Sequence, residues 1–476
     1  MSEQRTGPTA LVLAGGGAKG SFEAGALQYL VGEEQVVPQI ITATSAGALA
    51  ATVLAQARTL DEFIQRVDEI DQDLLAMTDT ASVFGQQGWL QALHGTSLGT
   101  TLEFAMTEGT RPPFPRRQTP VEPVGPGGPT RAQRRAAARA RRQRQRRMFR
   151  LASGAGWRLP RVRRQLRTSG ASILNLDPLA DALRQGGPTG IKQVDQSLIH
   201  RPGLQLRLAV TALRAGVLRY VTEDGILVED DALTPAPGDA AGPVDLIEGV
   251  MASASVPLVF PPRSLADDDY VDGGVLQVIP VRAAVQLGAT RIFALVALPL
   301  ALDRDDRNYA QSSAAQIGLR AMAMIAMADR QKENLQTPRP AGTTLSVIDP
   351  VVDVVGMFEI EQGLLRINTS YGWLRAADVL AVGDAELITT MAAQTHQIVQ
   401  ARVEAWNVEE RLWASTAEGD IAGDLAILRQ HKDRVHALMD QRKQLGFPVP
   451  EGWADWWSGY EIHGSGPAPD HLPPLA

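Results

Sequence analysis

The amino-acid sequence predicts an α/β fold with a largely parallel sheet, and three features support this. Short apolar segments typical of buried strands recur along the chain, and stretches with the 3.6-residue period of helices separate them. The first two strand segments each run through a turn of small residues directly into a helical pattern. Such alternation favours parallel strands joined by helices. The expected strands are residues 9–14, 39–44, 205–213, 217–221, 270–271, 291–296 and 344–348, and the expected helices include 21–31, 46–57, 281–287, 385–414 and 420–446.

The size and composition of the chain are those of a globular protein with a large core. Its 476 residues, 44% of them hydrophobic, suffice for two or three domains. The longest apolar run, Ile292 to Leu302, falls short of the roughly 18 to 20 apolar residues that span a bilayer. Residues 1–9 are polar and lack the features of a cleaved signal, and the absence of cysteine excludes disulfides and thiol catalysis. We therefore expect a cytoplasmic protein that would meet a membrane only from its surface.

Charge is distributed very unevenly along the chain. Residues 111–167 contain 18 arginines, no lysine and one acid, Glu122, so the rest has 28 basic against 52 acidic residues within a formal net charge of −7. The Pro/Gly- and Arg-rich sequence of this stretch cannot build a core. We predict a catalytic domain over 9–382 with an insertion at 109–168, then a helical extension over 383–460 and a disordered, Pro-rich tail over 461–476.

The glycine turn Gly15-Gly16-Gly17-Ala18-Lys19-Gly20 also satisfies the dinucleotide pattern G-x-G-x-x-G. A dinucleotide site requires an acid at the end of the next strand to hold the ribose, but that strand ends in Thr44 and Ser45. A Walker A loop requires Ser or Thr after its lysine, where this chain has Gly20. The sequence therefore argues against a nucleotide site.

The residues at the end of the second strand, Ala43-Thr44-Ser45-Ala46-Gly47, nearly match the nucleophile elbow G-x-S-x-G. Small neighbours are needed there because the nucleophile occupies a tight turn between strand and helix. The N-terminus of the following helix then supplies amides and a positive dipole near a developing oxyanion. A lone pentapeptide of this kind is more often a structural turn than a catalytic one.

A third motif, Tyr270-Val271-Asp272-Gly273-Gly274, has an acid at the end of a short strand, before two glycines that permit close backbone approach. By itself it is an ordinary Asp-Gly turn. A partly buried carboxylate beside a hydroxyl has its pKa raised by desolvation and can serve as a base. If the fold brings Asp272 to Ser45, the serine gains an activator within one hydrogen bond.

The three motifs, in this order, resemble those of the patatin-like phospholipase family: G-G-G-x-[RK]-G, then G-x-S-x-G, then D-G-[GA]. Asp177-Pro178-Leu179, the stretch 252–257 and Phe260-Pro261-Pro262 resemble further segments of the family. The resemblance covers roughly residues 9–382. It differs at Ala43, where the pattern has glycine, and at Val278, where family members often have asparagine.

The resemblance implies a three-layer α/β/α domain with a mostly parallel central sheet, followed here by C-terminal helices. It implies that Ser45 is the nucleophile and Asp272 the base of a two-residue dyad, with Gly273 and Gly274 completing the Asp motif. Ala43 and Gly47 would flank the nucleophile at the elbow. The oxyanion hole would be formed by the loop residues Gly15, Gly16, Gly17 and Lys19, of which Lys19 stands where the family usually has arginine. No metal or cofactor is expected.

A Ser-His-Asp triad fits the sequence less well than a dyad. The α/β-hydrolases place their nucleophile after several strands and follow the acid with a catalytic histidine. Here Ser45 follows the second strand, and the later histidines lie in the C-terminal helices or tail: His396, His431, His436, His463 and His471. None of them has a metal-ligand spacing with carboxylates.

The arginine-rich stretch Arg131–Arg167 has two open interpretations, a solvated loop or a basic arm that contacts anionic membranes. Each arginine near such a surface contributes on the order of 1 kcal/mol. Nucleic acid is a poorer fit because aromatic residues for base stacking are sparse.

The function expected from these motifs is hydrolysis of fatty acyl esters, as by a phospholipase A or esterase, through an acyl-enzyme. Two alternatives stay open: an acyltransferase using the same residues, and a non-catalytic lipid- or anion-binding module on the same scaffold.

Overall fold

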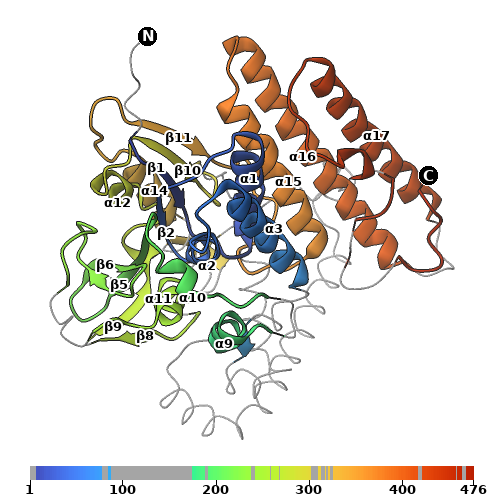
Figure 1. Cartoon of the computed structure of the whole chain (residues 1–476). Coiled ribbons are helices and arrows are strands. Elements are labelled where there is room, and N and C mark those ends of the chain that lie inside the picture. Colours follow the sequence, from blue (N-terminus) through green and yellow to red (C-terminus); the bar gives the residue numbers. More distant parts are fainter. Residues whose placement is uncertain are drawn as a thin grey trace, which may run out of the picture.

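The structure is a computed structural model of the chain (Figure 1). It describes residues 7–77, 84–86, 174–187, 191–236, 242–257, 259–266, 268–301, 309–311, 317, 320–321, 325–415, 421–456, 458–461, 463 and 468–475. The predicted insertion at 109–168, with the arginine-rich stretch, lies outside the described residues.

A nine-stranded mixed sheet forms the centre of the domain. Its main path runs β11-β10-β1-β2-β5-β6-β7, and β8 and β9 join beside β5. The five strands from β11 to β5 are mutually parallel, whereas β6 and β9 each run antiparallel to β5. The strands are β1 (Thr9–Leu13), β2 (Ile40–Ala43), β5 (Gln205–Ala212), β6 (Val217–Thr222), β7 (Leu227–Val228), β8 (Arg263–Leu265), β9 (Asp268–Asp272), β10 (Arg291–Leu295) and β11 (Thr344–Ile348). The α/β class with a mostly parallel sheet is therefore confirmed.

Helices cover both faces of the sheet, which makes three layers. In β1, Leu11 and Leu13 enter the larger core, whereas Ala10 and Val12 enter a second core on the opposite face. The larger core packs under α1, α3 and α15, and the second packs under α12 and α14 (Figure 1). Strands buried on both faces read as continuous apolar runs, as the sequence of β1 does. The helices are α1 (Gly20–Gln28), α2 (Ala46–Leu54), α3 (Leu60–Ala76), α9 (Asp177–Gln185), α10 (Gln196–Ile199), α11 (Leu246–Ser253), α12 (Val281–Gln286), α14 (Ala326–Leu335), α15 (Gln362–Leu380), α16 (Ala385–Trp413) and α17 (Ala422–Gln444).

One edge of β5 carries two strands in succession, and this brings distant parts of the sequence together. Residues 205–208 of β5 pair with β2, ending with Ala43 opposite Leu208. Residues 210–212 pair with β9, with Asp272 opposite Val210. The ends of β2 and β9 therefore meet at Ala209. A Cβ added to Gly273 would lie 2.4 Å from the Ala209 carbonyl oxygen, so only glycine fits at this junction.

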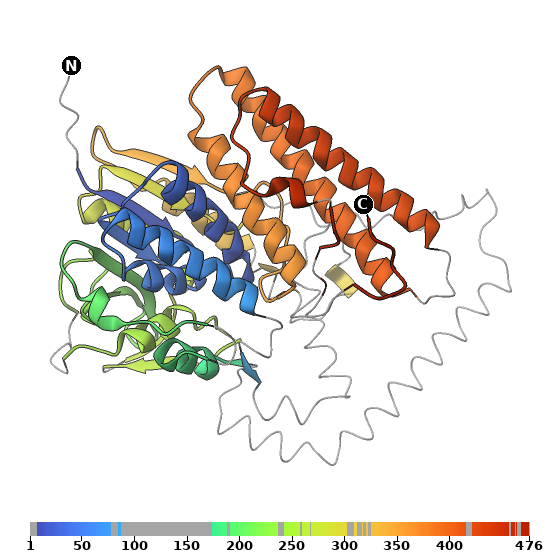
Figure 2. The same ribbon diagram turned by 45° about the vertical axis from the view of Figure 1, so that its right-hand side comes forward.

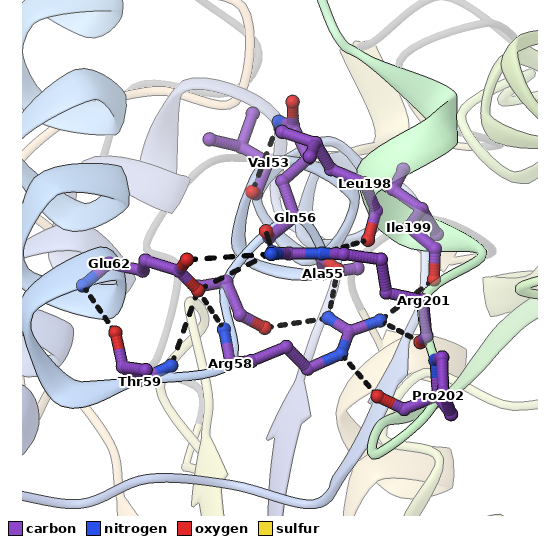
Figure 3. Close-up of polar contacts among 11 residues, drawn as sticks. Val53, Ala55, Gln56, Arg58, Thr59, Glu62, Leu198, Ile199, Arg201 and Pro202 are labelled. Atoms are coloured by element: carbon purple, nitrogen blue, oxygen red, sulfur yellow. Dashed lines mark hydrogen bonds and ion pairs between the residues drawn. The ribbon is translucent and has the colours of Figure 1, made fainter.

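Helix α2 begins directly after Ser45 and ends in a dense polar cluster, which we call the arginine knot and define as Arg58, Arg201 and Glu62 (Figure 3). The Arg58 guanidinium donates to carbonyl oxygens of Ala55, Ala57, Ile199, Arg201 and Pro202. Arg201 donates to the Gln56 carbonyl at 2.5 Å, and Glu62 accepts from the Arg58 amide at 2.6 Å. The knot satisfies the orphan carbonyls at the ends of α2 and α10.

The C-terminal part is helical, as predicted. Helix α15 packs along α1, and α16 and α17 lie as an antiparallel pair beyond α15 (Figure 2). Parts of the tail make contacts: Leu472 is buried in a small core with Leu412 and Leu428, and the Tyr460 hydroxyl donates to the Pro473 carbonyl. The domain boundaries at 382 and 460 stay predictions.

Within the described part of the chain, every helix is too short or too polar to span a bilayer.

Candidate active site

Ser45 occupies a strained turn between β2 and α2. Its φ of 56° and ψ of −127° lie in a region that residues with a side chain rarely adopt. The side chain is 9% exposed, and the backbone amide donates to the Ser253 hydroxyl at 3.0 Å. Strain of this kind persists only where the surroundings enforce it, and it clusters at functional sites.

Small residues around the elbow are required by contact distances. A Cβ added to Gly47 would lie 2.7 Å from the carbonyl oxygens of both Leu13 and Ala14. One added to Gly15 would lie 2.5 Å from the Ser45 Cβ. Ala43 is fully buried, so the alanine that replaces the family's glycine there fits without displacing the turn.

Asp272 ends β9 and lies against Ser45. Asp272 is 5% exposed, and its carboxylate accepts from the Gly274 amide at 2.7 Å. Burial raises the pKa of Asp272 to about 6, while hydrogen bonds from the Ser45 side chain and the Gly274 amide act in the opposite direction. A carboxyl with this pKa is ionised at neutral pH and basic enough to accept a proton from a hydroxyl.

A short segment at the end of α11 contacts both partners, which sequence reasoning missed. The Ser45 amide donates to the Ser253 hydroxyl, and the Asp272 amide donates to the Ser255 carbonyl at 2.9 Å. Both serines are fully buried. The available signal was the alternation of alanine and serine in 252–255, where buried hydroxyls require partners.

The glycine loop lies beside Ser45. Within the described residues, no carbonyl or side chain accepts from the amides of Gly15, Gly16 or Gly17. Gly17 has a φ of 60°, a conformation that favours glycine. The side chain of Lys19 does not join these amides, because its ammonium forms an ion pair with Asp353. The fold thus brings together Gly15, Ser45, Gly47, Asp272, Gly273 and Gly274, while Lys19 is turned to another partner.

Val278 follows the Asp motif at the position where the family often has asparagine. Here an asparagine comes from another element: Oδ1 of Asn334, on α14, accepts from the amides of Val278 and Ile279 at 2.9 and 3.1 Å. The departure at Val278 therefore leaves these two amides satisfied.

The described histidines make their contacts elsewhere. His463 lies between Glu409 and Glu410, His431 pairs with Glu404, and His436 pairs with Asp440. Within the described ranges, no histidine bonds to Ser45 or Asp272, and no group of three His, Asp or Glu side chains could hold a metal ion.

A family model described as Patatin-like phospholipase matches residues 11–285, more than half of the chain. The chain therefore belongs to the patatin-like phospholipase family. At the level of this family it is a lipid acyl hydrolase, and its substrates are lipids. The assignment of individual residues to catalysis stays a prediction.

Solved structures show only distant likenesses. VipD from Legionella pneumophila is 15% identical, with 93% of this chain and 81% of that chain covered and a TM-score of 0.30. The structure of full-length SpcU in complex with full-length ExoU from the type III secretion system of Pseudomonas aeruginosa is 15% identical, with coverages of 96% and 75% and a TM-score of 0.20. At these TM-scores neither likeness bears on function. No curated protein matches the chain.

Proposed function

We propose that this protein cleaves fatty acyl esters of glycerolipids by means of a Ser45–Asp272 dyad and an acyl-enzyme intermediate. The observation that carries the proposal is the placement of the strained Ser45 beside the buried carboxyl of Asp272, where the serine side chain acts on a carboxyl whose pKa burial raises to about 6. A hydroxyl beside such a base needs no histidine to be activated.

The proposed reaction has two stages, formation of an acyl-enzyme and its hydrolysis. The Ser45 hydroxyl attacks the ester carbonyl while its proton passes to Asp272, and the resulting oxyanion is bound by the loop amides of Gly15, Gly16 and Gly17. Collapse breaks the ester bond, and Asp272 returns the proton to the leaving alcohol. Water then attacks the acyl-enzyme, giving its proton to Asp272, and the fatty acid leaves as the proton returns to Ser45.

The electrostatics support this sequence of steps. Helix α2 begins at the residue after Ser45, so the positive end of its dipole favours negative charge on the carbonyl oxygen of the substrate ester. The amides of Gly15, Gly16 and Gly17 have no acceptor among the described residues and are free to donate to an oxyanion.

The proposal is tested by incubating the protein with phosphatidylcholine and phosphatidylglycerol vesicles and measuring fatty acid and lysolipid by mass spectrometry. We expect both products from the wild type and neither from Ser45→Ala. Acyl transfer to an added short-chain alcohol, without release of free fatty acid, would instead identify an acyltransferase. Products at the wild-type rate from Ser45→Ala would refute the dyad.

We propose in addition that the arginine-rich stretch 131–167 brings the enzyme to anionic membranes, because its charge is attracted to acidic headgroups. Deletion of residues 111–167 should lower turnover of phosphatidylglycerol vesicles while sparing a soluble short-chain ester. Equal losses on both substrates would contradict membrane contact.

A further inference from the structure

The glycine loop is braced by residues that follow the part of the chain matched by the family model. The segment 351–359, between β11 and α15, lies against the loop and the start of α1, and we call it the loop brace. Its contacts concern the three loop residues immediately before α1: Gly17, Ala18 and Lys19.

One hydrogen bond, one ion pair and one close backbone contact join the loop brace to the glycine loop. The Ala18 amide donates to the Met357 carbonyl at 2.8 Å. The Lys19 ammonium pairs with the Asp353 carboxylate, and the two side chains are only 3% and 14% exposed. At Gly17 an added Cβ would lie 2.2 Å from the Met357 carbonyl oxygen, so the backbones touch there.

The loop brace is itself held firmly. The Tyr371 hydroxyl, on α15, accepts from the amides of Val351 and Val352 at 2.7 and 3.4 Å. Within the brace, the Gly356 amide donates to the Glu359 carboxylate at 2.9 Å. The Tyr371 ring also packs edge-on against Phe22 of α1, so the same side chain contacts both the brace and the helix that follows the loop.

We infer that Asp353 is a positioning residue for the oxyanion hole, acting through Lys19. Glycine has no side chain to restrict its backbone dihedral angles. Three consecutive glycines therefore keep their amides in one orientation only if contacts from outside the loop fix them. The Lys19–Asp353 pair and the Ala18–Met357 bond fix the residues directly after Gly17. Lys19 thus orients the loop and does not touch the oxyanion.

The inference rests on the proposed function and assigns it a further residue. It explains why a cation follows the three glycines, because the cation is needed to reach a carboxylate on the brace. Preorganised donors stabilise a transition state more than a bound substrate, so misalignment should reduce kcat and leave KM almost unchanged.

The test compares Asp353→Asn with Asp349→Asn, a matched control. Asp349 lies four residues earlier, two residues before the brace, and is paired with Arg375 at 3.5 Å. On a soluble short-chain ester, we expect Asp353→Asn to lower kcat by about 10²-fold and the affinity for an alkylboronic acid by a similar factor. KM and the pH midpoint of kcat/KM should not change. Asp349→Asn should stay within about threefold of the wild type in kcat.

Wild-type kinetics in Asp353→Asn would overturn the inference. Loss of one partner leaves a buried charge, so if Asp353→Asn fails to fold, the apolar pair Lys19→Met with Asp353→Leu takes its place. We expect this double variant to fold and to keep the low kcat, and recovery of wild-type kcat would equally overturn the inference. A wild type that neither hydrolyses esters nor reacts with a fluorophosphonate would instead refute the proposed function.

Discussion

The two ends of helix α2 are built on opposite principles. At its start, Ser45 has a positive φ and its hydroxyl contacts a carboxyl that burial makes reluctant to ionise. At its end, the guanidinium of Arg58 takes five carbonyl oxygens, and Arg201 and Glu62 complete the arginine knot. The start of α2 has a strained backbone and polar groups that are available to a substrate. At its end, the carbonyl oxygens are hydrogen-bonded by the arginine knot.

This contrast separates reactivity from stability along a single helix. A nucleophile and its base must keep lone pairs and protons available for the reaction. The polar atoms at the start of α2 therefore cannot all be hydrogen-bonded within the protein. At the other end of this short helix, the arginine knot binds backbone carbonyl oxygens through side chains that take no part in the proposed reaction. Changes at the start should therefore alter rate, and changes at the end should alter folding.

The largest effect is expected from Ser45→Ala, which removes the nucleophile. The turnover number should fall by roughly 10⁴- to 10⁶-fold. Because alanine keeps the shape of the turn, the free energy of unfolding should change by less than about 1 kcal/mol. Ester hydrolysis and urea unfolding measure the two quantities, and a large loss of stability would mean that the start of α2 is structural.

Asp272→Asn should lower kcat by about 10²- to 10⁴-fold, because asparagine cannot accept the serine proton. The wild-type rate should rise with pH through a midpoint near 6, where Asp272 loses its proton. Its folded pKa is raised, so its favourable contribution to stability is present below the unfolded pKa of about 4 and is lost as pH rises through 6.

The variant should consequently be the more stable protein at pH 8, by on the order of 2 kcal/mol, and this difference should vanish near pH 4. Urea unfolding at the two pH values measures it. A variant less stable than the wild type at pH 8 would contradict the burial of an ionised carboxyl.

Arg58→Met tests the opposite end of α2. It leaves the carbonyls of Ala55 and Ile199, among others, without their donor and should lower the free energy of unfolding by about 2 to 3 kcal/mol. The kcat of the folded fraction should stay within about threefold of the wild type. Arg411→Met breaks an exposed ion pair with Asp424 and, as the control, should cost less than about 1 kcal/mol.

The smallest effect is expected from Ser253→Ala, which deprives the Ser45 amide of its acceptor. The elbow should lose part of its fixation, lowering kcat by about tenfold and stability by about 1 to 2 kcal/mol. Ser253→Thr keeps a hydroxyl and controls for loss of the acceptor. An unchanged kcat in Ser253→Ala would show that the turn is held by packing alone.

Much of the fold could be predicted from the sequence because its signals are local. The expected strands at 39–44, 205–213 and 344–348 match β2, β5 and β11 within about two residues, since apolar runs bounded by turns specify buried strands. The direction of β9 could not be predicted. Strand β9 runs antiparallel to β5 along residues 210–212, which β2 leaves unpaired because it pairs only with residues 205–208.

Some residues of the candidate site could be predicted from local motifs, and others could not. Ser45, Asp272 and the glycines were predicted because each lies in a contiguous motif. The geometry of a tight turn explains why small residues are needed around them. Asp353 and Asn334 were missed, because neither lies in a motif. Each acts through a contact across more than 50 residues of sequence, with Lys19 and with the amide of Val278. Only the packed structure creates such contacts.

If Asp272 alone activates Ser45, the pH dependence of covalent labelling of the serine must follow the ionisation of this one carboxyl. A fluorophosphonate probe is reacted with wild type, Ser45→Ala and Asp272→Asn between pH 4.5 and 8, and the adduct is followed by intact mass. We expect one adduct on Ser45, forming at a rate that rises through a single ionisation near pH 6, and no adduct in Ser45→Ala. Asp272→Asn should label slowly and without that ionisation. Labelling of Asp272→Asn at the wild-type rate, or with the same midpoint, would show that a group other than Asp272 activates Ser45.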